Sequence, residues 1–154
     1  MTTATSFDYD RFVTLDGLEL CHYVEGLLAD PAATISSVSL ERMLSELPGY
    51  DEYHLVYALT LGAAHSPQTF GPVLPQYLAH EESSVCCTAF NLLSKLPDAA
   101  ITQDLIESVR KVPERRLFFT KPDTGERVCP GTNSRLVAEI LGELTRRLQQ
   151  PQSQ

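Results

Sequence analysis

Residues 73–96 constrain the fold more than any other stretch, because they contain two short amphipathic patterns joined by a tight polar turn. The stretch reads VLPQYLAHEESSVCCTAFNLLSKL. Apolar residues recur near helical spacing on both sides of the turn at 80–82, which predicts one helix at 70–79 and another at 83–96. A helix pair of this size cannot bury its apolar face alone. The sequence therefore predicts an all-α fold of stacked antiparallel helical hairpins.

The rest of the chain supplies neighbours for this pair, giving about seven helices in all. Three of the helices are expected to begin after an N-cap residue: Asp16, Ser36 or Ser37, and Thr102. The other helices are expected at 16–29, 37–47, 51–64, 102–112 and 133–149. Residues 1–15 are expected to close one end of the core through Phe7, Tyr9, Phe12 and Val13.

Two of these helices carry specific expectations about burial. In the helix at 16–29, the pattern places five apolar side chains inward: Leu18, Cys21, Val24, Leu27 and Leu28. The helix at 51–64 is apolar nearly all round, which indicates burial on most sides. Tyr50, Tyr53 and Tyr57 lie at helical spacing, a stripe that favours packing over chemistry.

A shift of the chain by 31 residues superimposes its helical patterns. Leu47 then falls on Leu78, and a second shift brings Leu78 onto Val109. In the third unit the second helix is delayed, because residues 113–132 intervene before it. The sequence predicts three helix–turn–helix units, the third with an insertion in its internal turn.

The segment LAHEESSVCCTAFNLLSKLP resembles a HEAT-type repeat, with an acidic turn followed by a helix of small and apolar residues before a terminator. The resemblance covers residues 36–149. It implies a short α-solenoid that presents a surface to a partner, and it implies no catalytic residue. We expect a single domain over 1–150, followed by a frayed tail at 151–154.

The insertion, PERRLFFTKPDTGERVCPGT, is the strongest candidate for a binding element. Two apolar or mixed segments flank turn residues, which predicts a small β-hairpin or loop. Insertions in repeat proteins map to loops on one face, often the binding face. The candidate partner-binding residues here are Arg115, Arg116, Phe118, Phe119, Lys121 and Arg127. The alternative is that the two phenylalanines plug the end of the helical stack while the basic residues are solvated.

Two acidic turns complete the candidate surface. Asp51 and Glu52 occupy the same internal turn in one unit as Glu81 and Glu82 do in the next. If the units stack, these turns and the hairpin share one edge, which we expect to bind a partner. The alternative is that the carboxylates only complement helix dipoles, as acidic residues at helix N-termini ordinarily do.

Charge separates two hypotheses about that partner. Residues 1–109 carry three basic and fifteen acidic residues, a net charge of −12, whereas residues 110–154 carry nine basic and five acidic residues, a net charge of +4. The acidic part favours a basic protein partner. The alternative is a nucleic-acid or anion-binding module that uses the C-terminal cations Arg110, Lys111, Arg115, Arg116, Lys121, Arg127, Arg146 and Arg147.

The sequence offers little for catalysis, metal binding or a cofactor. His80-Glu81 resembles one His-Glu dyad of the HEAT-like deoxyhypusine hydroxylases, but a single dyad cannot hold their two irons. Cys21 and His22 are helix neighbours and point apart. Gly-rich phosphate loops, a secretory signal and an apolar run of about 20 residues are all missing. We therefore expect a cytoplasmic, non-enzymatic protein with reduced cysteines.

These features are similar to those of the immunity proteins that bacteria make against polymorphic toxins, some of which are HEAT-like. The resemblance implies inhibition by occlusion. The acidic edge would meet a basic toxin surface while residues 113–132 cover the toxin's active site.

Overall fold

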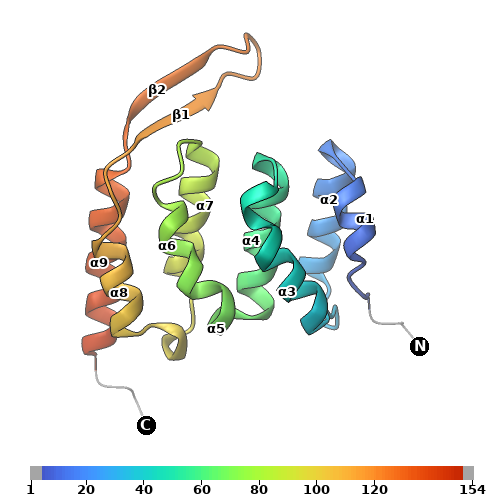
Figure 1. Cartoon of the computed structure of the whole chain (residues 1–154), viewed down its shortest axis with the longest axis horizontal. Coiled ribbons are helices and arrows are strands. Elements are labelled where there is room, and N and C mark those ends of the chain that lie inside the picture. The colour runs from blue at the N-terminus through green and yellow to red at the C-terminus, as the bar shows by residue number, and fades with distance from the viewer. Residues whose placement is uncertain (1–4, 151–154) are drawn as a thin grey trace. The chain divides into compact units, whose positions relative to one another are not determined.

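The computed structural model describes residues 5–150, which are mostly helical with one small antiparallel sheet (Figure 1). The predicted tail at 151–154 lies outside the described residues. The chain divides into two compact units, Met1–Ser66 and Pro67–Gln154. No helix among the described residues is long and apolar enough to cross a membrane.

The described part of the first unit consists of helices and their connections, with one isolated β-bridge between Ser6 and Thr34. Its elements are α1 (Tyr9–Thr14), α2 (Gly17–Ala29), α3 (Ser37–Glu46), a 3₁₀ turn (Leu47–Gly49) and α4 (Glu52–His65). The limits of α2, α3 and α4 agree with the predicted ones to within a residue or two. Helix α1 was expected only as a packing segment, and Asp8 caps it by accepting a hydrogen bond from the Arg11 backbone N–H.

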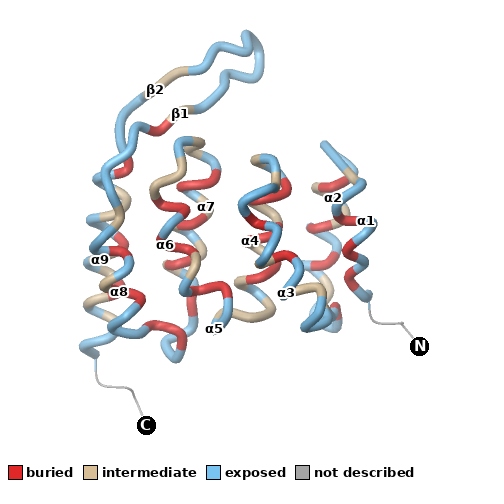
Figure 2. Tube along the Cα trace, in the orientation of Figure 1, coloured by how far each residue is buried: buried red, intermediate tan, exposed pale blue. Residues whose placement is uncertain are grey.

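Phe12 lies at the centre of the first unit's aromatic core. Its ring centroid is 5.5 Å from that of Phe7 and 5.3 Å from that of His54, and the ring is fully buried. Helices α2 and α4 lie side by side and run in the same direction (Figure 1). Buried residues, red in Figure 2, recur between exposed and intermediate ones along both helices.

The prediction that Leu18 and Leu28 face inward is wrong. Leu18 is 70% exposed and Leu28 is 44% exposed, while the buried stripe of α2 is Leu20, Val24 and Leu27. These three recur at i, i+4 and i+7, so they occupy one narrow side of the helix and leave the opposite side to solvent. Tyr53 of α4 is also exposed, at 64%, so the expected burial of the tyrosine stripe does not extend to its middle residue.

The second unit combines helices with the sheet. Its elements are α5 (Pro67–Phe70), a 3₁₀ turn (Gly71–Val73), α6 (Leu74–Tyr77), α7 (Ser83–Ser94), a 3₁₀ turn (Asp98–Ala100), α8 (Gln103–Arg110), β1 (Arg116–Thr120), β2 (Arg127–Thr132) and α9 (Ser134–Gln149). The predicted helix at 70–79 is instead broken into short pieces. Pro72 and Pro75 each lack a backbone N–H, so a regular helical ladder cannot run through them.

The predicted hairpin is confirmed. Strands β1 and β2 pair antiparallel, with Thr120 opposite Arg127 and a shift of register between Leu117 and Phe119. Pro130 lies in β2 at this irregularity, where a residue without an N–H is tolerated. The connecting turn contains Gly125 at φ +70°, a backbone conformation that favours glycine.

The buried side chain of Asn133 ties the second unit together. Its amide nitrogen donates to the carbonyls of Leu78, at 2.8 Å, and Pro113, at 3.0 Å. Its side-chain oxygen accepts from the Arg115 N–H at 2.8 Å, and its own N–H donates to the Arg115 carbonyl at 3.0 Å. Asn133, which directly precedes α9, thus connects the end of α6 with the start of the insertion, and it directly follows the insertion's last residue.

Replacing Asn133 with alanine is expected to lower the free energy of unfolding by about 2–4 kcal/mol, because buried backbone groups lose their partners. Urea denaturation followed by circular dichroism measures this. Asn91→Ala, at an exposed position of α7, is the matched control and should change stability by less than about 0.5 kcal/mol. Equal effects of the two substitutions would contradict the role assigned to Asn133.

Candidate functional site

The base of the hairpin is fixed to the helical part of the second unit. The Phe118 N–H donates to the Glu81 carbonyl at 2.7 Å, which forms a β-bridge between Phe118 and Glu82. Leu117 is buried, with 7% of its surface exposed. Together with the Asn133 contacts, these interactions hold the inner half of β1 in one position.

The Phe118 ring lies against two guanidinium groups. The Arg127 guanidinium is 4.5 Å from the ring centroid, and that of Arg116 is 5.6 Å away. Arg127 also forms ion pairs with Glu82 at 3.0 Å and with Glu81 at 3.6 Å. The acidic turn and the basic hairpin, predicted as neighbours on one edge, therefore contact and partly neutralise each other.

The outer half of the hairpin projects beyond the helices of the second unit (Figure 1). Phe119 is 39% exposed, and every residue from 121 to 126 is exposed. Lys121 makes an ion pair with Glu126 at 3.6 Å within this turn. Arg115 and Arg116 are exposed and form no ion pair within the described part of the chain. An aromatic ring and unpaired guanidinium groups thus remain available on the hairpin.

The alternative that both phenylalanines act as plugs fits the contacts poorly. Leu117, which the sequence analysis did not single out, is the buried residue of β1. Phe118 is half-buried beneath arginines, and Phe119 is the exposed one. Strand alternation explains the difference between Leu117 and Phe118, since successive side chains point to opposite faces.

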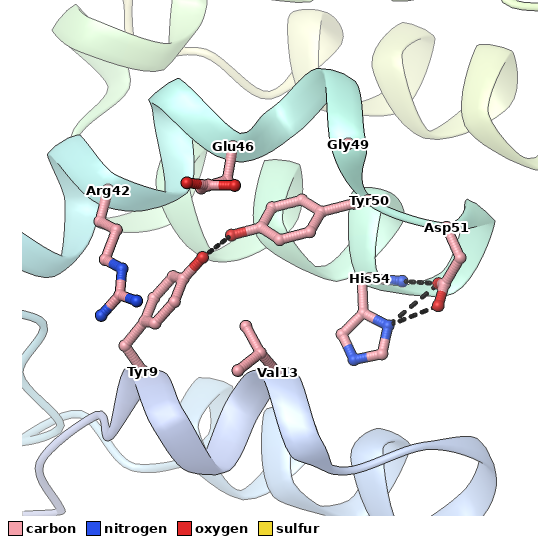
Figure 3. Close-up of a pocket in the computed structure, with 8 residues that line it drawn as sticks. All are labelled: Tyr9, Val13, Arg42, Glu46, Gly49, Tyr50, Asp51 and His54. Carbon is pink, nitrogen blue, oxygen red and sulfur yellow. Dashed lines mark hydrogen bonds and ion pairs between the residues drawn. The ribbon is translucent and has the colours of Figure 1, made fainter.

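In the first unit, Asp51 has a structural role at the start of α4. Its carboxylate accepts from the His54 backbone N–H at 2.8 Å and faces His54 Nδ1 at 2.8 Å (Figure 3). Burial raises the pKa of Asp51, but the hydrogen bonds from His54 outweigh it and hold the pKa below its usual value. On the other side of the ring, His54 Nε2 lies 3.1 Å from the Phe12 carbonyl oxygen.

An open pocket of about 320 Å³ adjoins this cap (Figure 3). Its lining includes a pair of phenols, Tyr9 and Tyr50, whose hydroxyl oxygens are 2.8 Å apart. Burial, reinforced by the hydrogen bond with Tyr9, raises the pKa of Tyr50 and keeps it a neutral phenol. Arg42 lies 4.1 Å over the Tyr9 ring, while Glu46, one turn later, lines the same pocket.

The pocket supplies hydrogen-bond donors and acceptors and contains no activated nucleophile among its lining residues. Sequence analysis missed it because Tyr9 and Tyr50 are 41 residues apart, and helical spacing carries no information about such a meeting. The one available signal was the cluster of aromatic residues before Thr14, which was assigned to the core.

Four of the eight candidate C-terminal cations form ion pairs within the described part of the chain. Arg127 and Lys121 have the partners described above, and Arg110 pairs with Glu107. Arg147 donates to Asp98 at 2.6 Å and to two carbonyls at the end of α7. These contacts partly neutralise the positive charge that would otherwise attract the phosphates of a nucleic acid.

Groups suited to metal binding or nucleophilic chemistry do not come together in the described residues. No cluster of three or more His, Cys, Asp or Glu side chains occurs in residues 5–150. His80 Nδ1 accepts a hydrogen bond from the Glu82 N–H, so this histidine closes its own turn. The four cysteines are free, and the Cys129 thiol donates to the Gly131 carbonyl at 3.4 Å.

Comparisons with protein-family models, with curated proteins and with solved structures found no match to this chain.

The Asp51 cap predicts a specific pH dependence. Because its folded-state pKa lies below 3.8, Asp51 stabilises the fold above that pH and loses this contribution as the pH falls through the folded-state pKa. Asp51→Ala should cost about 1 kcal/mol at neutral pH, whereas Asp51→Asn keeps the backbone cap and should cost less. Urea denaturation between about pH 7 and pH 3 measures both effects.

Asp51→Asn should also show a shallower loss of stability in acid than the wild type. Asp104→Asn, which removes an exposed first-turn carboxylate from α8, is the control. Identical acid profiles for the wild type and Asp51→Asn would show that the His54 contact does not stabilise the fold.

The contact between hairpin and turn predicts a measurable coupling. A double-mutant cycle with Arg127→Gln and Glu82→Gln should give about 0.5–1 kcal/mol, because Glu82 is only 21% exposed in this pair. The helix pair Arg135–Glu139, with Arg135 90% exposed, should give about 0.3 kcal/mol. A coupling for Arg127–Glu82 no larger than that of the control pair would contradict the bracing role.

Proposed function

We propose that this chain is a non-catalytic protein-binding module, an immunity protein or inhibitor that binds a cognate toxin and occludes it. One observation carries the proposal. The hairpin is fixed at its base by Asn133, Leu117 and the Phe118–Glu81 hydrogen bond, while its outer half is exposed. This is the arrangement expected of an element that enters a partner.

The fixed base matters energetically. A loop that is ordered before binding loses less conformational entropy when the complex forms. Here the strand ladder and the Arg127–Glu82 ion pair restrict the hairpin in the free protein. The exposed contact groups are an aromatic residue, Phe119, and the guanidinium of Arg116, and both residue types are enriched among binding hot spots.

Long-range charge supports a basic partner. Residues 1–66 carry two basic and ten acidic residues, whereas residues 67–154 carry ten of each, so the whole net charge of −8 belongs to the first unit. A charged surface of this kind accelerates association with a partner of opposite sign.

The proposal also includes the finer architecture and the compartment. The helix pairs of each unit are HEAT-like repeats that together form a short α-solenoid, and the protein acts in the cytoplasm. The matching of helical patterns at an offset of 31 residues supports the repeats.

The experiment is a pull-down from native lysate with the tagged protein and two hairpin variants. One variant replaces residues 121–126 by Asn-Gly, which keeps the Thr120–Arg127 pair and supplies a two-residue turn. The other is Phe119→Ser. We expect wild type to retain a stoichiometric protein partner, and both variants to lose it with at least a tenfold fall in affinity, corresponding to about 1.4 kcal/mol.

Leu148→Ser is the matched control, because Leu148 of α9 has the same 39% exposure as Phe119. It should bind as the wild type does, and circular dichroism should be unchanged for all variants. A partner retained equally by the hairpin variants would refute occlusion by the hairpin. Recovery of nucleic acid that washes off in moderate salt would favour the nucleic-acid hypothesis instead.

A further inference from the structure

An unpartnered face runs along α2 and α4 in the first unit. On α2 it follows i, i+3, i+7 and i+10 spacing, and on α4 it contributes two tyrosines one turn apart. We define the α2/α4 face by six residues: Leu18, Cys21, Glu25, Leu28, Tyr53 and Tyr57.

Two contacts indicate how the residues of this face are arranged along the two helices. Near the N-terminal ends of both helices, His54 of α4 meets the Phe12 carbonyl, and Phe12 lies five residues before Gly17, the first residue of α2. Further along, the Tyr57 hydroxyl lies against the Cys21 thiol. Because the helices run in the same direction, this order also brings Leu18 to the same end of the face as Tyr53 (Figure 1).

The face exposes more apolar surface than packing of the unit explains. Leu18 is 70% exposed, Tyr53 is 64% exposed and Leu28 is 44% exposed. A single exposed leucine is ordinary, but several large apolar side chains on one surface are typical of interaction sites. The polar residue among them, Glu25, accepts a hydrogen bond from the Cys21 thiol at 3.3 Å and remains exposed.

The charge around the face has one sign. Helices α2 and α4 contain no lysine or arginine, and their carboxylates and caps are Asp16, Glu19, Glu25, Asp30, Asp51 and Glu52. The two arginines of the first unit lie over tyrosine rings outside the α2/α4 face, Arg11 over Tyr23 and Arg42 over Tyr9. This field repels an anionic lipid surface and a second copy of the same acidic unit.

We propose that the α2/α4 face binds a basic amphipathic helix of a partner protein. Apolar side chains at i, i+3 or i+4, and i+7 of that helix contact Leu18, Tyr53 and Leu28, and a lysine or arginine pairs with Glu25. This surface and the hairpin consist of different residues, so the inference does not depend on the proposed function and goes beyond it.

The test uses a fluorescent peptide of about 18 leucine and lysine residues, which spans about 27 Å as an amphipathic helix. A scrambled peptide of equal composition, without an apolar side, is the comparison. Fluorescence anisotropy with the full chain should show saturable binding of the amphipathic peptide, and weaker binding of the scrambled one. Leu18→Ser combined with Tyr53→Ser should weaken binding about tenfold or more.

Val38→Ser is the matched control, since Val38 of α3 is an exposed apolar residue, at 72%, outside the face. It should leave affinity unchanged, and Glu25→Gln should lower it about threefold. All four positions are solvent-accessible, so the variants should fold, as circular dichroism will show.

Several results would overturn the inference. Absence of saturable binding, equal binding of the scrambled peptide, or full affinity in the double variant would each show that the face does not bind a basic amphipathic helix. Self-association or binding to anionic vesicles, measured by sedimentation and lost in the double variant, would assign the face to a different occupant.

Discussion

The buried amide of Asn133 determines where the insertion leaves the helices of the second unit. Its hydrogen bonds to Leu78, Pro113 and Arg115 satisfy backbone groups that no helix or strand provides for. With the base thus fixed, Phe118 meets the turn at Glu81 and Arg127 reaches Glu82. The hairpin is therefore a continuation of the folded unit, and its outer half is exposed.

The first unit has a different organisation, in which an aromatic core around Phe12 carries an acidic surface. Asp51, which sequence analysis placed at a binding edge, caps α4 and contacts His54. Glu82 is likewise engaged by Arg127. The carboxylates best placed to meet a partner are instead those of α2, beside side chains that a soluble helix would ordinarily bury. In the proposed complex, charge attraction brings a basic partner close and apolar contact retains it.

Much of the secondary structure could be predicted because it depends on local rules. Ser36 and Thr102 cap their helices as expected, since a side-chain acceptor at this position satisfies a free N–H wherever the helix lies. Asp16, also expected as a cap, stands at the N-cap position of α2 but makes no side-chain capping hydrogen bond. The hairpin followed from its turn residues. The prediction of one helix at 70–79 was wrong because prolines interrupt a helix even where the apolar spacing is helical. The candidate residues of the hairpin were identified, but Leu117 and the Arg127–Glu82 pair were not.

By itself, the sequence determined the helical class, most helix limits, the hairpin and the excess of acidic residues, all of which are set by neighbours within about four residues or by composition. Only the tertiary structure decided which apolar stripe of α2 is buried, that Tyr9 meets Tyr50, and that Asn133 joins three segments. The physical reason is that periodicity shows which side chains share a helix face, whereas burial depends on which face a distant element covers. Leu18 and Leu20 are almost equally apolar, and packing alone separates them.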